Sequence, residues 1–256
     1  MNAQNHVITE YNGEVLELKL NYPETYNSLT SSTLELLNEK LNEAEKNDAI
    51  KIIFLSGEGK AFCSGQNLKE VTGTNAQSVK NLLENYYIPL IKRMRELSKP
   101  IICGLNGLAA GAGVSLALAC DVVLAKQSAK FKLGFSKIGL IPDAGGSFAL
   151  LKALGQYRAM DLMLTDEIIE AEELKRLGIV SRVFEDDVFK EECAKYLQIV
   201  LGTSMEAADK GKQLINQALC GSLNSVLNME SVFQSELAES VFHQEKVRQF
   251  LAGSKK

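Results

Sequence analysis

The chain has 256 residues, of which 46% are hydrophobic, and its 28 basic and 32 acidic side chains leave a net charge of −4. This length corresponds to one large domain, or a domain with a small appendage, and can bury a substantial core. Lys and Arg are scattered without a basic cluster, so binding to nucleic acid or to an anionic membrane is not expected.

The number and spacing of the histidines and cysteines argue against a metal site and a disulfide framework. The two histidines, His6 and His243, lie near opposite ends of the chain, and the five cysteines have no CxxC spacing. A zinc site needs three or four clustered ligands, so no metal site is predicted. We interpret the cysteines as reduced, mostly buried thiols of an intracellular protein. With neither a signal peptide nor an uninterrupted membrane-spanning stretch in the pattern, we expect a cytoplasmic protein.

Strands and helices alternate along the first half of the chain. The predicted elements are a strand over 15–20, a helix over about 31–46, a strand over 52–55, a helix over 76–97, a strand over 100–104, a helix over 113–119 and a strand over 121–125. Pro89 is expected to kink or split the second of these helices. This alternation predicts βαβ units and a mainly parallel sheet in an α/β fold.

Strand patterns stop after about residue 200. Three amphipathic helices are predicted instead, over 205–219, 223–237 and 241–251. We therefore divide the chain into a core over 1–200 and a C-terminal helical region over 201–256. Such a helical region either caps the core or makes an oligomer contact.

Two glycine-rich turns follow predicted strands, over 57–68 and over 106–116. Neither has the spacing of a P-loop or of a dinucleotide-binding fingerprint, so kinase and NAD-dependent chemistry are not expected. Glycines in strand-to-helix turns let backbone N–H groups approach a ligand, and two converging turns could cradle one oxyanion. The alternative is that these glycines serve tight turns and close helix–sheet packing.

A carboxylate stands in the third informative stretch, residues 135–147. Asp143 follows Pro142 among apolar residues and precedes a predicted helix from about Ala144. Two interpretations are open. Asp is a preferred N-cap residue, so Asp143 could cap that helix. Alternatively, the carboxylate lies in an apolar pocket, where its pKa would rise and make it a usable base near neutral pH.

Motifs along nearly the whole chain resemble, in this order and spacing, the enoyl-CoA hydratase/isomerase (crotonase) superfamily. The motifs are Leu20–Pro23 with Asn27–Leu29, Ala61–Leu68, Asn106–Gly113 with Cys120 and Asp121, Gly139–Pro142 with Gly145 and Gly146, and Glu172–Leu174 with Leu177–Val180 and Val183. The resemblance implies a spiral of ββα units followed by C-terminal helices that trimerise. It further implies an acyl-CoA substrate, no bound cofactor beyond the coenzyme A of that thioester, and a homotrimer or hexamer.

The same resemblance implies the roles of the glycine-rich turns. The backbone N–H groups of Gln66 and Ala112 would hold the thioester oxygen. Stabilising an enolate at that oxygen acidifies the adjacent carbon, and one such donor typically lowers the barrier by about 2.7–4 kcal/mol.

The superfamily divides by its acid and base groups. Its hydratases use a pair of glutamates, and the matching positions here are Ser115 and Phe135, neither of which is a carboxylate. Asp143 matches the aspartate of isomerases that act on dienoyl-CoA or on a ring-epoxide thioester of phenylacetate degradation. The resemblance therefore implies an acyl-CoA isomerase with Asp143 as acid/base. The alternatives are a hydratase or lyase that recruits Asp143 or a water differently, and a non-catalytic acyl-CoA-binding subunit.

Residues that would contact the substrate also follow from the resemblance. They are Thr25 and Tyr26 at the adenine end, Ser64, Gly65, Asn67, Leu68 and Gly111 in the turns, Lys69 near a coenzyme A phosphate, Phe135 in the acyl pocket, and Phe250 reaching coenzyme A from a neighbouring subunit. Lys69 could equally be a solvated surface lysine, and Phe250 could simply pack in its helix. Asn67 departs from the usual Asp. Tyr86 and Tyr87 are candidates for the acyl-pocket wall, although an amphipathic helix face explains Tyr86 without a ligand.

Overall fold

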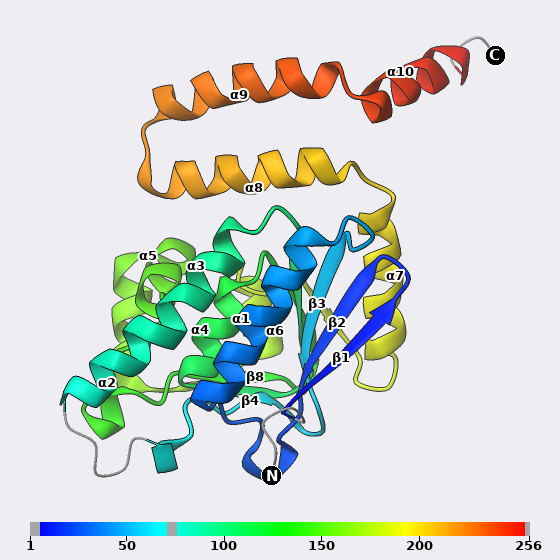
Figure 1. Cartoon of the computed structure of the whole chain (residues 1–256). Coiled ribbons are helices and arrows are strands. Elements are labelled where there is room, and N and C mark those ends of the chain that lie inside the picture. Colours follow the sequence, from blue (N-terminus) through cyan, green and yellow to red (C-terminus); the bar gives the residue numbers. More distant parts are fainter. Residues whose placement is uncertain (1–5, 71–75, 254–256) are drawn as a thin grey trace.

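The strands form two sheets, of six and four strands (Figure 1). The computed structural model describes residues 6–70 and 76–253. The six-stranded sheet contains, in spatial order, β1 (Val7–Asn12), β2 (Val15–Leu20), β3 (Ile52–Gly57), β5 (Ile101–Leu105), β7 (Val122–Lys126) and β10 (Arg182–Phe184). The four-stranded sheet contains β4 (Ala61–Cys63), β6 (Leu108–Ala110), β8 (Lys130–Lys132) and β9 (Ile168–Glu170).

The strand pairing confirms a mainly parallel α/β fold. Only β1 on β2 and β9 on β8 are antiparallel; the other pairs within the two sheets are parallel. The pairs β3–β4, β5–β6 and β7–β8 each give one strand to each sheet before the chain turns into a helix, which is the predicted spiral of ββα units. The second strand of each pair was not predicted, because three residues are too few to show a hydrophobic period.

The helices predicted over 31–46, 113–119 and the C-terminal region are confirmed, whereas the helices over 171–176 and 189–201 were not predicted. The helices are α1 (Ser31–Lys46), α2 (Ala76–Leu82), α3 (Ile88–Glu96), α4 (Ala112–Ala119), α5 (Gly146–Thr165), α6 (Ala171–Arg176), α7 (Phe189–Leu201), α8 (Met205–Cys220), α9 (Leu223–Ala238) and α10 (Val241–Gly253). Short 3₁₀ turns are η2 (Pro23–Thr25), η3 (Leu68–Glu70) and η5 (Ser136–Ile138). The C-terminal helices α8 to α10 confirm the expected change to an all-helical region.

The predicted helix over 76–97 is split ahead of Pro89, as expected. A π-helical turn, η4 (Leu83–Tyr87), joins α2 to α3, and the Ile88 N–H donates to the Leu83 carbonyl. Pro89 then stands in the first turn of α3, where a missing N–H is tolerated. The wider turn shifts the helical phase by about one residue. Tyr87 is buried as a result, whereas Tyr86, which the apolar period places on the buried face, is only half-buried.

Both faces of the central strands β3, β5 and β7 are buried, which explains their continuous apolar runs. Ile52 faces α7 and packs in a cluster with Phe189, while Ile53 faces the opposite cluster with Leu34 of α1 and Met94 of α3. The prediction that the cysteines are mostly buried is also confirmed: four are buried and Cys220 is exposed. In the described ranges, no helix has the length and apolar character required to cross a bilayer.

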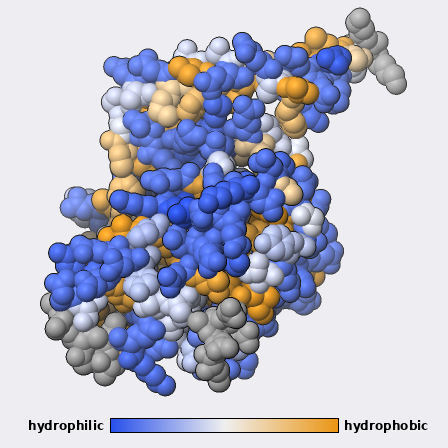
Figure 2. Space-filling view, viewed as in Figure 1, coloured by the Kyte–Doolittle hydropathy of each residue, from blue (hydrophilic) through white to orange (hydrophobic). Residues whose placement is uncertain are grey.

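The C-terminal helices extend from the core as an arm (Figure 1). Helix α8 lies across the core, α9 runs back along α8, and α10 continues to the C-terminal end. No residue of α9 or α10 is buried, and hydrophobic side chains surface on the arm among hydrophilic ones (Figure 2). The exposed apolar residues of these two helices include Leu223, Leu227, Val232, Val241, Phe242, Val247, Phe250 and Leu251.

A buried lysine attaches α8 to the core. Lys212 donates to the Met94 carbonyl and to Asp121 Oδ2, each at 2.8 Å, and Arg95 bonds the other Asp121 oxygen at 3.3 Å. Burial lowers the pKa of Lys212, and the adjacent Asp121 carboxylate opposes this shift. The helical region after residue 200 is therefore tied to the core by a buried ion pair.

Lys212→Met is expected to destabilise the protein by about 3 kcal/mol. Removing one partner of a buried ion pair usually costs 3–5 kcal/mol, and Arg95 still pairs with Asp121 here. Urea unfolding at neutral pH measures the loss. As a control, Lys195→Met removes exposed ion pairs on α7 and should cost less than about 1 kcal/mol. Equal effects of the two substitutions would contradict a structural role for Lys212.

Candidate active site

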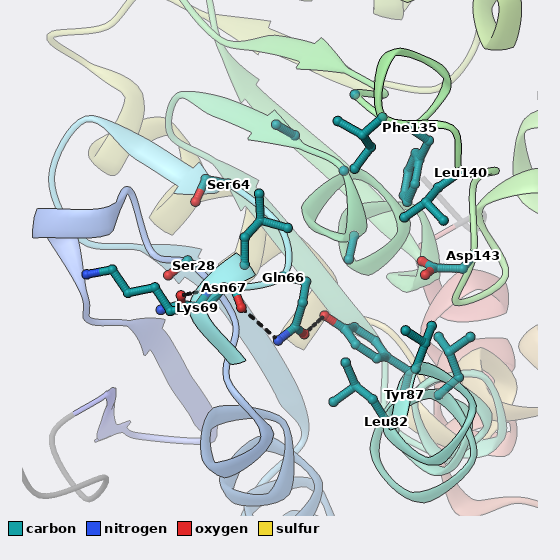
Figure 3. Close-up of a pocket in the computed structure, with 18 of the residues that line it drawn as sticks. Ser28, Ser64, Gln66, Asn67, Lys69, Leu82, Tyr87, Phe135, Leu140 and Asp143 are labelled. Atoms are coloured by element: carbon teal, nitrogen blue, oxygen red, sulfur yellow. Dashed lines mark hydrogen bonds between the residues drawn. The ribbon is translucent and has the colours of Figure 1, made fainter. Parts of the chain in front are cut away.

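A cavity of about 480 Å³ opens where the glycine-rich turns, the α2–η4 segment and the chain between β8 and α5 meet. Its walls are largely apolar at one end and polar at the other (Figure 3). The lining residues are Thr25, Ser28, Ser64, Gln66, Asn67, Leu68, Lys69, Val79, Leu82, Leu83, Tyr87, Ala110, Gly111, Ala112, Gly134, Phe135, Ile138, Leu140 and Asp143.

In the first glycine-rich turn, the Gln66 N–H points away from the segment at Leu29 with which Gln66 pairs. The Leu29 N–H donates to the Gly65 carbonyl and the Asn67 N–H donates to the Leu29 carbonyl, both at 2.7 Å. These bonds flank Gln66 in a parallel bridge, so the N–H of Gln66 points to the opposite side. It has no acceptor in the part of the chain that the structure describes.

The second turn presents the Ala112 N–H, the first of helix α4. The preceding Gly111 N–H donates to Lys132 in strand β8 at 3.0 Å, whereas the Ala112 N–H has no acceptor among residues 6–70 and 76–253. The two turns touch: a Cβ added to Gly65 would lie 3.0 Å from the Ala112 nitrogen. Two free N–H groups therefore converge on the cavity, at a helix N-terminus that favours negative charge.

Asp143 lies across the cavity from Lys69 and Asn67 (Figure 3). Its Oδ1 atom is shielded from solvent and has no hydrogen-bond partner within the described ranges. Desolvation by burial raises the pKa of this carboxyl above its ordinary value. The N-cap of α5 is Gly145, and no side chain caps that helix. The interpretation of Asp143 as a helix cap is therefore wrong, because the helix begins too late for its carboxylate to reach the first N–H groups.

The positions that carry hydratase glutamates are occupied differently. Ser115 is buried on α4, and its hydroxyl donates to the backbone carbonyl of Asp143 at 2.8 Å. Phe135 is buried and contributes an apolar wall. Among the described lining residues, Asp143 is the one carboxylate, and Tyr87 and Lys69 are the other titratable groups.

Tyr87 links the π-helical turn to the first glycine-rich turn. Its hydroxyl donates to Gln66 Oε1 at 2.8 Å (Figure 3). Gln66 Nε2 in turn donates to Glu70 Oε2 at 3.3 Å. Glu70 also accepts the Ser31 N–H at the start of α1. Burial, and then the nearby Cys63, Asp143 and Glu70, raise the pKa of Tyr87 well above its ordinary value, so it stays protonated as a donor.

Tyr87→Phe is expected to cost about 1 kcal/mol of stability, because it leaves the Gln66 amide oxygen without its buried donor. The loss is measured by urea unfolding. Tyr157→Phe on α5 is a suitable control, because that side chain is 87% exposed and should tolerate the change. A Tyr87→Phe protein as stable as the wild type would show that this hydrogen bond is not formed in solution.

The polar end of the cavity is built on tight turns. Ser64 donates its hydroxyl to the Thr25 carbonyl at 2.7 Å, and Asn67 Oδ1 accepts the Lys69 N–H at 3.1 Å. Asn67 thus closes the η3 turn through an oxygen that Asp would also supply, so its departure from the superfamily pattern preserves the loop. The Lys69 side chain is exposed beside this end of the cavity.

Most of the predicted site residues meet in this cavity. Those that line it are Thr25, Ser64, Gln66, Asn67, Leu68, Lys69, Gly111, Ala112, Phe135 and Asp143. Gly65 lies directly behind it, against Ala112. Tyr26 is exposed outside the lining, and Phe250 is 74% exposed on α10, in the arm. The expected contact of Phe250 with coenzyme A across a subunit boundary stays a prediction.

Several cavity residues were not predicted. They are Ser28, Val79, Leu82, Leu83, Ala110, Gly134, Ile138 and Leu140. Val79 and Leu83 fit the apolar period of a core-facing helix. The sequence pattern therefore does not distinguish packing in the core from contact with a ligand at these positions. Ile138 and Leu140 stand in a short 3₁₀ turn and the loop after it, where no period exists. Within the described residues, no cluster of three or more His, Cys, Asp or Glu side chains could hold a metal ion.

Comparisons with known proteins agree with this geometry. A family model described as enoyl-CoA hydratase/isomerase matches residues 10–255. The 1,2-epoxyphenylacetyl-CoA isomerase of Escherichia coli K12 is 37% identical over 242 residues, covering 93% of this chain and 92% of that protein. A protein named probable enoyl-CoA hydratase from Rhodobacter capsulatus is also 37% identical, over 91% of this chain and 90% of its own length.

Solved structures show the same likeness along the chain. The crystal structure of an enoyl-CoA hydratase from Polaromonas sp. JS666 superposes with a TM-score of 0.90 at 32% identity, covering 96% of this chain and 97% of the other. An enoyl-CoA hydratase from Bacillus anthracis superposes with a TM-score of 0.92 at 28% identity, covering 97% and 96% of the two chains. The chain therefore belongs to the enoyl-CoA hydratase/isomerase family and has the crotonase fold.

Proposed function

We propose that this protein is an acyl-CoA isomerase in which Asp143 transfers a proton between two carbons of the acyl group. The observation that carries the proposal is the set of groups in the cavity. It contains two free backbone N–H donors and a single carboxylate among its described residues, whose pKa is raised by burial. An isomerase that moves one proton needs one base and one oxyanion site, whereas the two-glutamate hydration mechanism needs a second carboxylate.

The reaction proceeds through a thioester enolate. The Asp143 carboxylate takes a proton from C2 of a 3-enoyl thioester, and the C–H electron pair moves onto the thioester oxygen, which the Gln66 and Ala112 N–H groups stabilise. The protonated Asp143 then returns the proton to C4, leaving the double bond in conjugation at C2. No water is consumed and no oxidation state changes. For a ring-epoxide thioester, the same transfer would accompany opening of the ring system to the isomeric oxepin.

The polar end of the cavity is proposed to receive coenzyme A. Lys69 would meet a phosphate and the Thr25 segment would approach the adenine end. The exposed apolar residues of α9 and α10 support assembly into a trimer or hexamer, which would bring the arm with Phe250 to a neighbouring subunit. The similarity to a 1,2-epoxyphenylacetyl-CoA isomerase supports an acyl group that carries a ring epoxide.

Paired spectrophotometric assays test the proposal. One contains a 3-enoyl-CoA and the other a 2-enoyl-CoA, and the absorbance of the conjugated thioester is followed in each. We expect a rise with the 3-enoyl substrate and no loss with the 2-enoyl substrate, after which ring-epoxide thioesters are compared for rate. Loss of signal from the 2-enoyl substrate would instead show hydration, as the names of several relatives suggest. Binding without turnover of any of these thioesters would identify a non-catalytic acyl-CoA-binding subunit.

A further inference from the structure

The backbone of Asp143 is held more firmly than its carboxylate. Its carbonyl accepts two hydrogen bonds, from the Ser115 hydroxyl at 2.8 Å and from the Gly146 N–H at 2.7 Å. The carboxylate Oδ1 has no partner in the described part of the chain. The place of the carboxylate in the cavity is therefore determined by where these two bonds hold the main chain.

Ser115 belongs to the same helix as an oxyanion donor. Ala112 is the first residue of α4, and Ser115 follows three positions later, which places the two residues on neighbouring positions of one helix face. One turn of helix thus connects the Ala112 N–H to the loop that carries Asp143. We infer that Ser115 is a positioning residue, which sets the distance between Asp143 and the oxyanion donors; this inference rests on the proposed function.

A cavity behind the loop that carries Asp143 makes the hydrogen bond from Ser115 important for holding that loop in place. This second cavity, of about 530 Å³, lies on the other side of the loop and is lined by Ser115, Ala144, Gly145 and Phe148 among others. Packing on that side therefore leaves room for the loop to move away from the substrate cavity. The Ser115 hydroxyl opposes this movement by tying the loop to α4.

Gly146 leaves just enough room for the Ser115 hydroxyl. A Cβ added to Gly146 would lie 2.5 Å from Ser115 Oγ, while the next neighbours, Ser115 Cβ and Pro142 Cβ, would be 3.4 and 3.6 Å away. Gly146 is the first residue of α5 and its φ is not positive, so alanine suits its backbone. The Ser115 hydroxyl is thus the main obstacle to a side chain at position 146.

Ser115→Ala is expected to lower kcat for isomerisation about 10- to 100-fold, because a base misplaced by about 1 Å can cost that much. KM should change little, since the Gln66 and Ala112 donors and the apolar walls remain. If the loop relaxes toward water, the acid limb of the pH–rate profile should also move to lower pH. Thr203→Ala, which removes a hydroxyl-to-carbonyl bond near the end of α7, is the matched control and should leave both readouts unchanged.

A double-mutant cycle with Gly146→Ala tests the contact itself. The new methyl group should displace the Ser115 hydroxyl, so Gly146→Ala alone should lower kcat as Ser115→Ala does. In the Ser115→Ala background the methyl group has space, and the double variant should be no slower than Ser115→Ala. Gly211→Ala on α8, where a Cβ would meet nothing within 4 Å, is the control for replacing a helical glycine.

The outcomes separate the positioning role from the proposed function. Wild-type kcat and pH profile in Ser115→Ala would overturn the inference, as would an equal loss from Gly146→Ala in both backgrounds. If Ser115→Ala does not fold, Gly146→Ala still perturbs the same bond with the serine in place, and an unchanged kcat there would overturn the inference. Full activity of Asp143→Asn would instead overturn the proposed function, whatever the effect of Ser115→Ala.

Discussion

Asp143→Asn is expected to lower kcat for isomerisation by about three orders of magnitude, since positioned acid–base groups typically contribute 10²- to 10⁴-fold. The amide has nearly the same shape but cannot accept the substrate proton. The Gln66 and Ala112 N–H groups are untouched, so the thioester should still bind. The measurement is kcat on the 3-enoyl substrate together with the Kd of a non-isomerisable acyl-CoA. As the control, Asp209→Asn changes a half-buried carboxylate on α8, remote from the cavity lining, that accepts a hydrogen bond from Gln213; it should be fully active.

The pH profile gives Asp143 a second signature. A base works only when it is deprotonated, and burial raises the pKa of this carboxyl. Activity of the wild type should therefore be constant at high pH and fall as the pH drops through that raised pKa. The residual rate of Asp143→Asn should lack this limb. If the fall in activity at low pH persisted unchanged in Asp143→Asn, it would be caused by another group, and Asp143 would not be the base.

The same substitution is expected to raise stability at neutral pH. The folded protein holds a carboxylate whose Oδ1 has no partner among the described residues, and its raised pKa means that folding disfavours the charged form. This penalty is complete above the folded-state pKa and disappears as the pH falls below the unfolded-state value. Asp143→Asn should therefore be more stable than the wild type at pH 7 and equal to it in strong acid. Urea unfolding at both pH values would show whether the difference has this pH dependence.

Gly65→Ala is expected to disable the oxyanion site. Gly65 has φ +88°, and an added Cβ would lie 2.8 Å from the Ala110 carbonyl oxygen and 3.0 Å from the Ala112 nitrogen. Both neighbours are backbone, so the two turns must separate. Loss of one aligned donor typically lowers kcat by about 10²- to 10³-fold. The variant should also lose stability, by more than the 1–2 kcal/mol or so that a left-handed conformation costs an L residue.

Gly13→Ala is the matched control for this loss. Gly13, in the turn between β1 and β2, also has a positive φ of +61°, but a Cβ there would meet nothing within 4 Å. It should therefore show only the conformational cost, with full activity. The comparison uses kcat and urea unfolding for both variants. If Gly65→Ala were as active as Gly13→Ala, the close approach of the two turns would not be needed for catalysis.

The sequence by itself determined the main elements and the family to which the chain belongs. Helix α1 and the buried strands β3, β5 and β7 follow from hydrophobic period and length, because packing in the core requires those patterns. Pro89 indicated the break ahead of α3, since it has no N–H to donate. The residue pattern alone left a structural role open for the glycine-rich turns and for Asp143, and the resemblance to the family selected them as candidates.

Only the tertiary structure decided how these groups work together. The short strands β4, β6 and β8 are specified by their neighbours in the sheet, because three residues carry no period of their own. The π-helical turn that brings Tyr87 to Gln66 depends on packing against the core. Whether Asp143 caps a helix or faces a cavity depended on where α5 begins, and the contact of Ser115 with the Asp143 carbonyl joins residues 28 positions apart. Such contacts are set by the path of the chain in space, which local residue patterns do not contain.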